Sequence, residues 1–284
     1  MSPGSRAGIV VVALALIGGA FWLGRRQSEP PPAPPPPPIA RPASPAPPPP
    51  PPAPEKPAIA HPIETPRAPA LPGLDSSDDF LKKALDDLIG HKSVLSFVIT
   101  DGLARRFVAT VNNLATDNAP SGHWPVNRTA GRFETQAGDG GAVISAGNAE
   151  RYTPFVRLVD GVDTQRLVAL YTRVYPLLQR AYEELGFPGQ YFNDRVVEVI
   201  DNLLATPAVN GPLLVKQVTA DGKPRPPTAG GLYIFDDPSL ESRTAGQKIL
   251  LRVGPDNARR LKAKLADIRR RIAKGPGPDT TSAR

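Results

Sequence analysis

The sequence predicts a mainly α-helical globular domain with a minor β hairpin, behind a single N-terminal transmembrane helix and a disordered proline-rich linker. Three observations predict this organisation: an uncharged apolar run, a crowd of prolines after it, and apolar residues at helical spacing through most of the remainder. The predicted divisions are a short cytoplasmic N-terminus (1–6), the membrane helix (7–24), the spacer (25–73), the helical domain (74–274) and a disordered tail (275–284).

The apolar run at residues 7–24 contains 18 residues and no charge. As an α-helix it would span roughly 27 Å, close to the ~30 Å hydrocarbon core of a bilayer. We interpret it as an uncleaved signal anchor, and the small residues Gly18, Gly19 and Ala20 leave a cleaved signal peptide as the alternative. The short N-terminus and the long spacer favour a single-pass protein of the inner membrane, with a cytoplasmic N-terminus and the bulk of the chain in the periplasm.

The spacer is defined by proline, because residues 30–72 hold 22 of the 37 prolines. Proline fixes φ and lacks an amide donor, so the tract is expected to populate polyproline II. At about 3.1 Å per residue it would reach on the order of 130 Å. We interpret it as a stalk; a docking strip for proline-binding modules and a linker without any reader are the alternatives.

Composition argues against several functions. The chain has no cysteine and three widely separated histidines, so we expect no metal site and no cofactor. Residues 255–274 hold eight Lys/Arg against two Asp/Glu, whereas residues 74–254 hold 19 against 21. The basic terminal segment is therefore interpreted as a solvated helix face or a contact with an anionic membrane or polymer. Nucleic acid is not expected, because no aromatic interleaving or docking motif accompanies the charge.

The first half of the domain begins with helical patterns. Ser77 is predicted to cap a helix with its hydroxyl, and Gly90 to end it. Residues 94–99 suit either a short helix or a buried strand, and Asp101 is the predicted cap of a helix that ends at Ala115.

Residues 116–148 are predicted to be irregular, with short strands around 132–135 and 142–145. The run Gly138-Asp139-Gly140-Gly141 is predicted to be a hairpin turn rather than a phosphate or calcium loop, because no lysine-threonine pair follows it. A helix is predicted over 149–159, with Pro154 in its first turn.

The second half begins with the longest pattern, a helix capped by Asp163, kinked at Pro176 and ended by Gly186. Asn193 or Asp194 is predicted to cap the next helix. Strands at 213–218 and 232–235 are predicted to form a long-looped hairpin. A helix follows from Pro238 through Leu251, and a final one begins at Pro255. The stripe of the final helix is predicted to pack on the domain body: Leu261, Leu265, Ile268 and Ile272.

Three segments carry a family resemblance: FLKKALDDLIG with RRFVATVNNLA, then YPLLQRAYEELGFPGQYFNDRVVEVIDNLLATP, then SRTAGQKILLRVGPDNARRLKAKL. Their combination resembles the proteobacterial family called domain of unknown function 3014, over residues 74 to about 274. The resemblance implies a membrane-tethered envelope protein with an N-terminal anchor and a proline-rich linker. It implies no activity and no site residues.

Aromatic residues concentrate between positions 171 and 192: Tyr171, Tyr175, Tyr182, Tyr191 and Phe192. Helical spacing favours core packing for most of them, and a peptide- or glycan-binding groove is the alternative. Tyr191 and Asn193 fall at the predicted loop and cap. With Arg195, they are our candidate residues for an exposed binding contact; we assign no catalytic residue.

We therefore predict a non-enzymatic binding or scaffold module of the cell envelope, with an envelope protein or anionic polymer as its partner. The alternative is an envelope hydrolase that uses Glu198 and Asp201, which lie three apart on one predicted helix. Because Arg195 precedes Glu198 by three residues, a surface ion pair is the plainer interpretation. A third hypothesis is an energy-coupling transducer of the TonB kind. That hypothesis predicts a terminal βαβ unit, whereas this sequence ends in two helical patterns.

Overall fold

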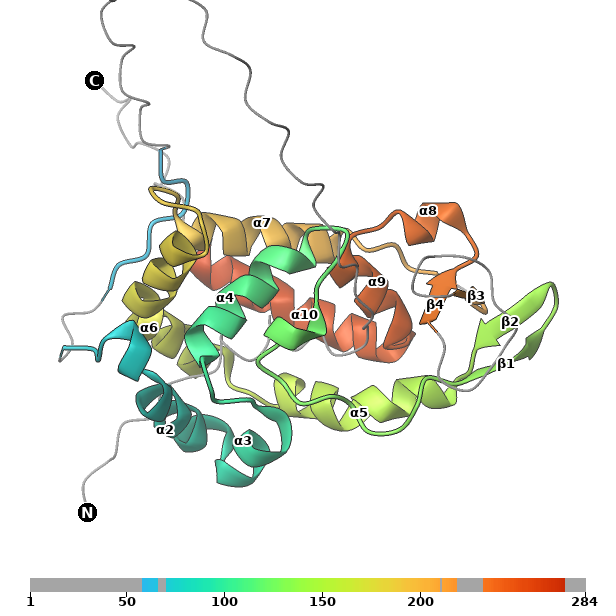
Figure 1. Ribbon diagram of the computed structural model, residues 1–284, viewed down its shortest axis with the longest axis horizontal. Helices are drawn as coiled ribbons and strands as arrows, with labels where there is room; N and C mark the ends of the chain where they lie inside the picture. Colours follow the sequence, from blue (N-terminus) through green and yellow to red (C-terminus); the bar gives the residue numbers. More distant parts are fainter. Residues whose placement is uncertain (1–57, 66–69, 210, 219–231, 274–284) are drawn as a thin grey trace, which may run out of the picture.

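The computed structural model describes residues 58–65, 70–209, 211–218 and 232–273 (Figure 1). Over these residues the chain is mainly helical with a small antiparallel sheet, which confirms the predicted fold class. The predicted membrane helix, most of the predicted spacer and the tail lie outside the described residues. None of the helices in the described ranges combines the length and the apolar character needed to cross a membrane.

The N-terminal part of the domain is a series of short helices. The elements are η2 (Leu74–Ser76), α2 (Asp78–Ile89), α3 (His91–Phe97) and α4 (Leu103–Leu114). The ambiguous segment 94–99 is mainly helical, because α3 ends at Phe97, and Val98 then forms an isolated antiparallel bridge with Val126 rather than a strand.

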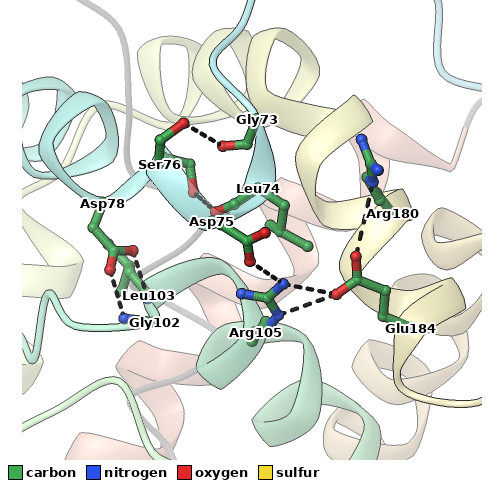
Figure 2. Close-up of polar contacts among 11 residues, drawn as sticks. Gly73, Leu74, Asp75, Ser76, Asp78, Gly102, Leu103, Arg105, Arg180 and Glu184 are labelled. Carbon is green, nitrogen blue, oxygen red and sulfur yellow. Dashed lines mark hydrogen bonds and ion pairs between the residues drawn. The ribbon is translucent and has the colours of Figure 1, made fainter.

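Two predicted helix caps are wrong, each for a different reason, and Figure 2 shows the contacts of Asp78 that replace one of them. The Asp78 carboxylate, on α2, accepts the backbone N–H groups of Gly102 at 2.7 Å and Leu103 at 3.1 Å, where α4 begins. Asp101 therefore does not cap α4. The Ser77 hydroxyl does not cap α2 either, because it donates to the Leu74 carbonyl at 2.7 Å and closes the η2 turn.

The sheet consists of two hairpins placed side by side, in the order β1-β2-β3-β4. Its strands are β1 (Thr135–Gly138), β2 (Gly141–Ile144), β3 (Leu214–Val218) and β4 (Leu232–Phe235). Gly138 pairs with Gly141, which confirms the predicted turn, although β1 begins three residues later than predicted. The predicted hairpin of β3 and β4 also forms, but it is widened to four strands because β2 pairs with β3.

Helix α5 (Gly147–Asp160) begins earlier than predicted, so Pro154 lies in its interior rather than in its first turn. The early start has a local cause. The buried Asn148 side chain accepts the Glu134 N–H at 3.0 Å and donates to the Ser145 carbonyl at 3.1 Å. These bonds hold the start of α5 to the residue just before β1.

Helix α6 (Thr164–Glu184) begins as predicted, because the Asp163 carboxylate accepts the Arg166 N–H at 2.7 Å. It is followed by α7 (Phe192–Leu204).

The predicted helix from Pro238 to Leu251 is instead two helices: α8 (Pro238–Glu241) and α9 (Ala245–Arg252). The Thr244 hydroxyl accepts the Gln247 N–H at 3.4 Å and so starts a new helix where continuation was predicted.

The last helix, α10 (Pro255–Ile272), contacts α5, α6, α7 and α9 and so lies within the helical layer (Figure 1). Its predicted stripe is buried, at 3% exposure or less for each of Leu261, Leu265, Ile268 and Ile272, which confirms packing on the domain body. Some of its cations also serve the body, since the Lys264 ammonium donates to the Val162 carbonyl at 2.7 Å.

The substitution Leu265→Ala tests the role of α10 in the core. Removing a side chain that is 1% exposed loses its transfer free energy and leaves a cavity, at a cost of about 2–5 kcal/mol. Urea denaturation of the purified protein measures this change. The exposed Arg270→Ala on the same helix is the control and is expected to change stability by less than about 0.5 kcal/mol.

The substitution Asp78→Ala tests the cap of α4. It removes the acceptor for two backbone N–H groups, so we expect a loss of about 1–2 kcal/mol in the free energy of unfolding. Asp79→Ala, at the exposed neighbouring position of the same helix, is the matched control. Equal losses for both variants would show that the helix dipole, rather than the cap, explains the effect.

Candidate peptide-binding site

Most of the aromatic concentration is core. Tyr171, Tyr175, Tyr182 and Phe192 are each at most 4% exposed, as the core interpretation predicted, and only Tyr191 is half-buried. Burial raises the pKa of both Tyr171 and Tyr175, so their hydroxyls remain hydrogen-bond donors throughout the physiological range.

The start of α7 is held in place by Gln179 on α6. The Gln179 side chain accepts the Phe192 N–H at 2.8 Å and donates to the Gln190 carbonyl at 2.7 Å. Tyr175 adds two bonds, donating its hydroxyl to Gln179 at 2.9 Å and accepting the Asn193 N–H at 3.1 Å. The turn between α6 and α7 is therefore fixed from one side by α6.

Asn193 is fully buried, so the predictions that it caps α7 or forms an exposed contact are wrong. Its carbonyl oxygen accepts the Tyr171 hydroxyl at 2.9 Å. Its amide nitrogen donates to the His61 carbonyl at 2.8 Å and to the Ile272 carbonyl at 3.1 Å. Asn193 therefore joins α6, the end of α10 and a segment that precedes the domain.

That segment, residues 58–65, crosses the start of α7 and is held by its backbone. The Asp194 carboxylate accepts the N–H groups of Ala60 at 3.0 Å and His61 at 2.7 Å. The Tyr191 hydroxyl accepts the Ile63 N–H at 2.7 Å. Asp194 therefore binds two consecutive amides of another segment and does not cap α7. The alternative prediction, that Asp194 rather than Asn193 caps this helix, is also wrong.

The predicted boundary of the spacer at residue 73 is accordingly too late. Residues 58–65 are hydrogen-bonded to the domain, and Ile63 and Leu71 pack against the hydrophobic core.

Arg105 on α4 joins two other elements, because it donates to Asp75 at 2.7 Å and to Glu184 at 2.8 Å and so connects η2 to the end of α6 (Figure 2).

A groove of about 450 Å³ continues from Ala58 along α7, and Tyr191, Asp194 and Arg195 contribute to its lining. Arg195 is held rigidly there. Its guanidinium donates to the Asn112 side chain at 3.0 Å and to the Asn112 carbonyl at 2.9 Å, and it pairs with Glu198 at 2.8 Å. Of the three predicted contact residues, Tyr191 and Arg195 therefore line the groove, whereas Asn193 is buried and does not.

The two carboxylates of the hydrolase alternative both take part in ion pairs. Glu198 pairs with Arg195, as predicted, and Asp201 pairs with Arg269 on α10, whose guanidinium donates to it at 2.8 Å. Within the described ranges, no group of three or more His, Cys, Asp or Glu side chains could hold a metal ion.

The sequence did not reveal that Asp194 accepts hydrogen bonds from a distant segment, and it placed His61 in a disordered spacer. No local signal could have revealed either, because an acidic residue in the first turn of a helix is ordinarily explained by the helix dipole. The hydrogen bonds join residues more than 130 positions apart in the chain.

The chain matches the family model described as Protein of unknown function (DUF3014) over residues 103–269, which is more than half of its length. No curated protein and no solved structure matches it. The matched region extends from the start of α4 to Arg269 within α10, so it includes α7 but not residues 58–65.

The substitution Asp194→Ala tests the binding of residues 58–65. It removes the acceptor of two amides, so hydrogen exchange at Ala60 and His61 is expected to become at least about tenfold faster. Glu198→Ala, one turn farther along α7, is the matched control and is expected to leave both rates unchanged. Unchanged rates in Asp194→Ala would mean that these hydrogen bonds do not hold the segment.

Proposed function

We propose that this chain, which belongs to the DUF3014 family, is a non-enzymatic binding or scaffold module held at the inner membrane on a proline-rich stalk. The stalk is the proline-rich sequence that ends at residues 58–65. The membrane attachment is proposed from the apolar residues 7–24, and the periplasmic location from the long proline-rich spacer that follows them.

The observation that carries the proposal is the way the stalk joins the domain. Four hydrogen bonds connect residues 60–63 to the start of α7, and all four use backbone groups of that segment. A simple tether needs no such bonds. A tether that holds its domain in one orientation needs such bonds, because an extended segment without them is free to rotate about the junction.

The groove beside the stalk supplies a binding surface that such an orientation would present. Its walls combine an aromatic ring at Tyr191 with a fixed guanidinium at Arg195 and a carboxylate at Asp194. Rigid aromatic and charged groups on the start of a well-packed helix are suited to recognising an extended peptide, so we propose an envelope protein as the partner. An anionic polymer on the basic face of α10 is a weaker proposal, because several of those cations already pair with the domain.

The structure offers no comparable support for the hydrolase. General acid–base hydrolysis needs two carboxylates opposed across a substrate, whereas Glu198 and Asp201 each have a cationic partner. We therefore base the proposed function on binding.

Reporter fusions test the location. Alkaline phosphatase, which is active only outside the cytoplasm, is fused after Lys274 of the full chain and is expected to be active. A fluorescent protein that matures only in the cytoplasm is fused at the same position as the matched control and is expected to stay dark. A stable, silent phosphatase fusion with a bright fluorescent fusion would overturn the proposed topology.

In the same cells, a photoreactive residue at Glu198 in the groove tests the binding role. It is expected to crosslink to a discrete protein, whereas the same residue at the exposed Glu150 is not. Equal or absent crosslinking at the two positions would reject the groove as the binding surface.

A further inference from the structure

A second cleft lies between the sheet and helices α5, α9 and α10. Its volume is about 770 Å³, within the range of about 300–1,000 Å³ that is typical of small-molecule sites. Its walls come from the end of β2, the chain between α7 and β3, the end of α9 and the first turns of α10.

The lining is mostly apolar. It combines aliphatic side chains with proline rings. The apolar lining residues include Ile144, Pro207, Val209, Leu213, Leu250 and Ala258. Ile144 and Leu213 lie on the sheet side, and Ala258 lies on α10. Transferring a hydrocarbon chain from water into such a lining is favourable, because apolar surface is removed from water.

The charged lining residues are all cationic. They are Arg252, Arg259 and Lys262, and the described lining contains no Asp or Glu. This excess contrasts with the near balance of charge over residues 74–254. The helix dipoles do not explain this excess of cations. The negative end of α9 and the positive end of α10 lie at the same wall, so their effects on a nearby charge oppose each other.

Two of the cations have donors available to a ligand. Arg259 and Lys262 are three residues apart on α10, so they lie on one face of the helix. The Lys262 ammonium donates to the Thr206 carbonyl at 2.7 Å and has two further N–H groups. Arg259 pairs with Asp256, but both side chains are at least 74% exposed, and such surface pairs contribute little to stability.

The third cation, Arg252, is a buried residue of the cleft wall. It is 5% exposed, and its guanidinium carbon lies 4.3 Å from the centre of the Phe235 ring, next to the Tyr233 carbonyl. Arg252 therefore forms part of the wall, while α10 supplies the donors that a ligand can reach.

A cleft that is apolar toward the sheet and cationic toward α10 matches a molecule with an apolar chain and one anionic end. We propose that it binds a free fatty acid, with the carboxylate on Arg259 and Lys262 and the acyl chain along Ile144 and Leu213. A lipid with two acyl chains fits less well, because one such cleft has room for a single ligand of drug-like size.

Photolabelling of the full chain in phosphatidylcholine nanodiscs tests the proposal. The probe is palmitic acid with a diazirine in its chain, and the label is mapped by mass spectrometry. We expect labelling of peptides from residues 206–213 and 250–262, at least tenfold more than with the methyl ester of the same probe. Labelling of the cleft by acid and ester alike, or labelling elsewhere only, would overturn the proposal.

Two variants identify the groups responsible. The double variant Arg259→Gln/Lys262→Gln is expected to lose at least tenfold of the cleft labelling. The matched control Arg270→Gln/Arg271→Gln removes the same charge from α10 outside the cleft and is expected to label as the unaltered chain does. Equal labelling of the two double variants would contradict the assigned carboxylate site.

Ala258→Phe narrows the cleft without changing charge and is also expected to reduce labelling; full labelling of a folded Ala258→Phe chain would overturn the assigned position of the acyl chain. Helical content and melting temperature are recorded for every variant. The comparison of acid with ester needs no substitution and remains decisive if a variant fails to fold.

Discussion

The buried side-chain amide of Asn193 is the interaction on which the arrangement of this domain depends. A buried amide that lacked partners would cost about 1–3 kcal/mol, so its position requires acceptors and a donor from the surroundings. Those partners come from three places: the Tyr171 hydroxyl on α6, the Ile272 carbonyl at the end of α10, and the His61 carbonyl before the domain. One side chain therefore sets how the stalk, α6 and the last helix meet.

Two aspartates in first helical turns have the same role at different places. Asp78 on α2 and Asp194 on α7 each accept two consecutive backbone N–H groups from another part of the chain. Both positions favour a carboxylate for the helix dipole as well. The dipole explains why an aspartate is present, and the distant amides explain why these particular aspartates are needed.

The two surfaces of the domain differ in how they are built. The groove along α7 adjoins the stalk and is fixed by Arg195, whose guanidinium is bound to Asn112. The cleft at α10 lies against the sheet, where Lys262 donates to the Thr206 carbonyl and Arg259 pairs with the exposed Asp256. The first surface is therefore suited to a partner that the stalk orients, and the second to a small molecule that enters from solvent.

The sequence by itself determined the helical class, the start of α6 at Asp163, the turn between β1 and β2, and the buried stripe of α10. Each of these depends on local propensity or on periodicity within one element, and both can be read from neighbouring residues. The core role of the aromatic residues and the pairing of Arg195 with Glu198 were predictable for the same reason.

Only the tertiary structure decided which donors the polar side chains reach. Asn193 and Asp194 looked like helix caps, yet the carbonyls that the Asn193 amide reaches and the amides that Asp194 binds lie more than 70 residues away in the sequence. The four-stranded sheet, the docking of residues 58–65 and the cleft at α10 likewise require segments that meet only after folding. Spacing along the chain predicts which face of an element is buried, but it contains no information about what that face will meet.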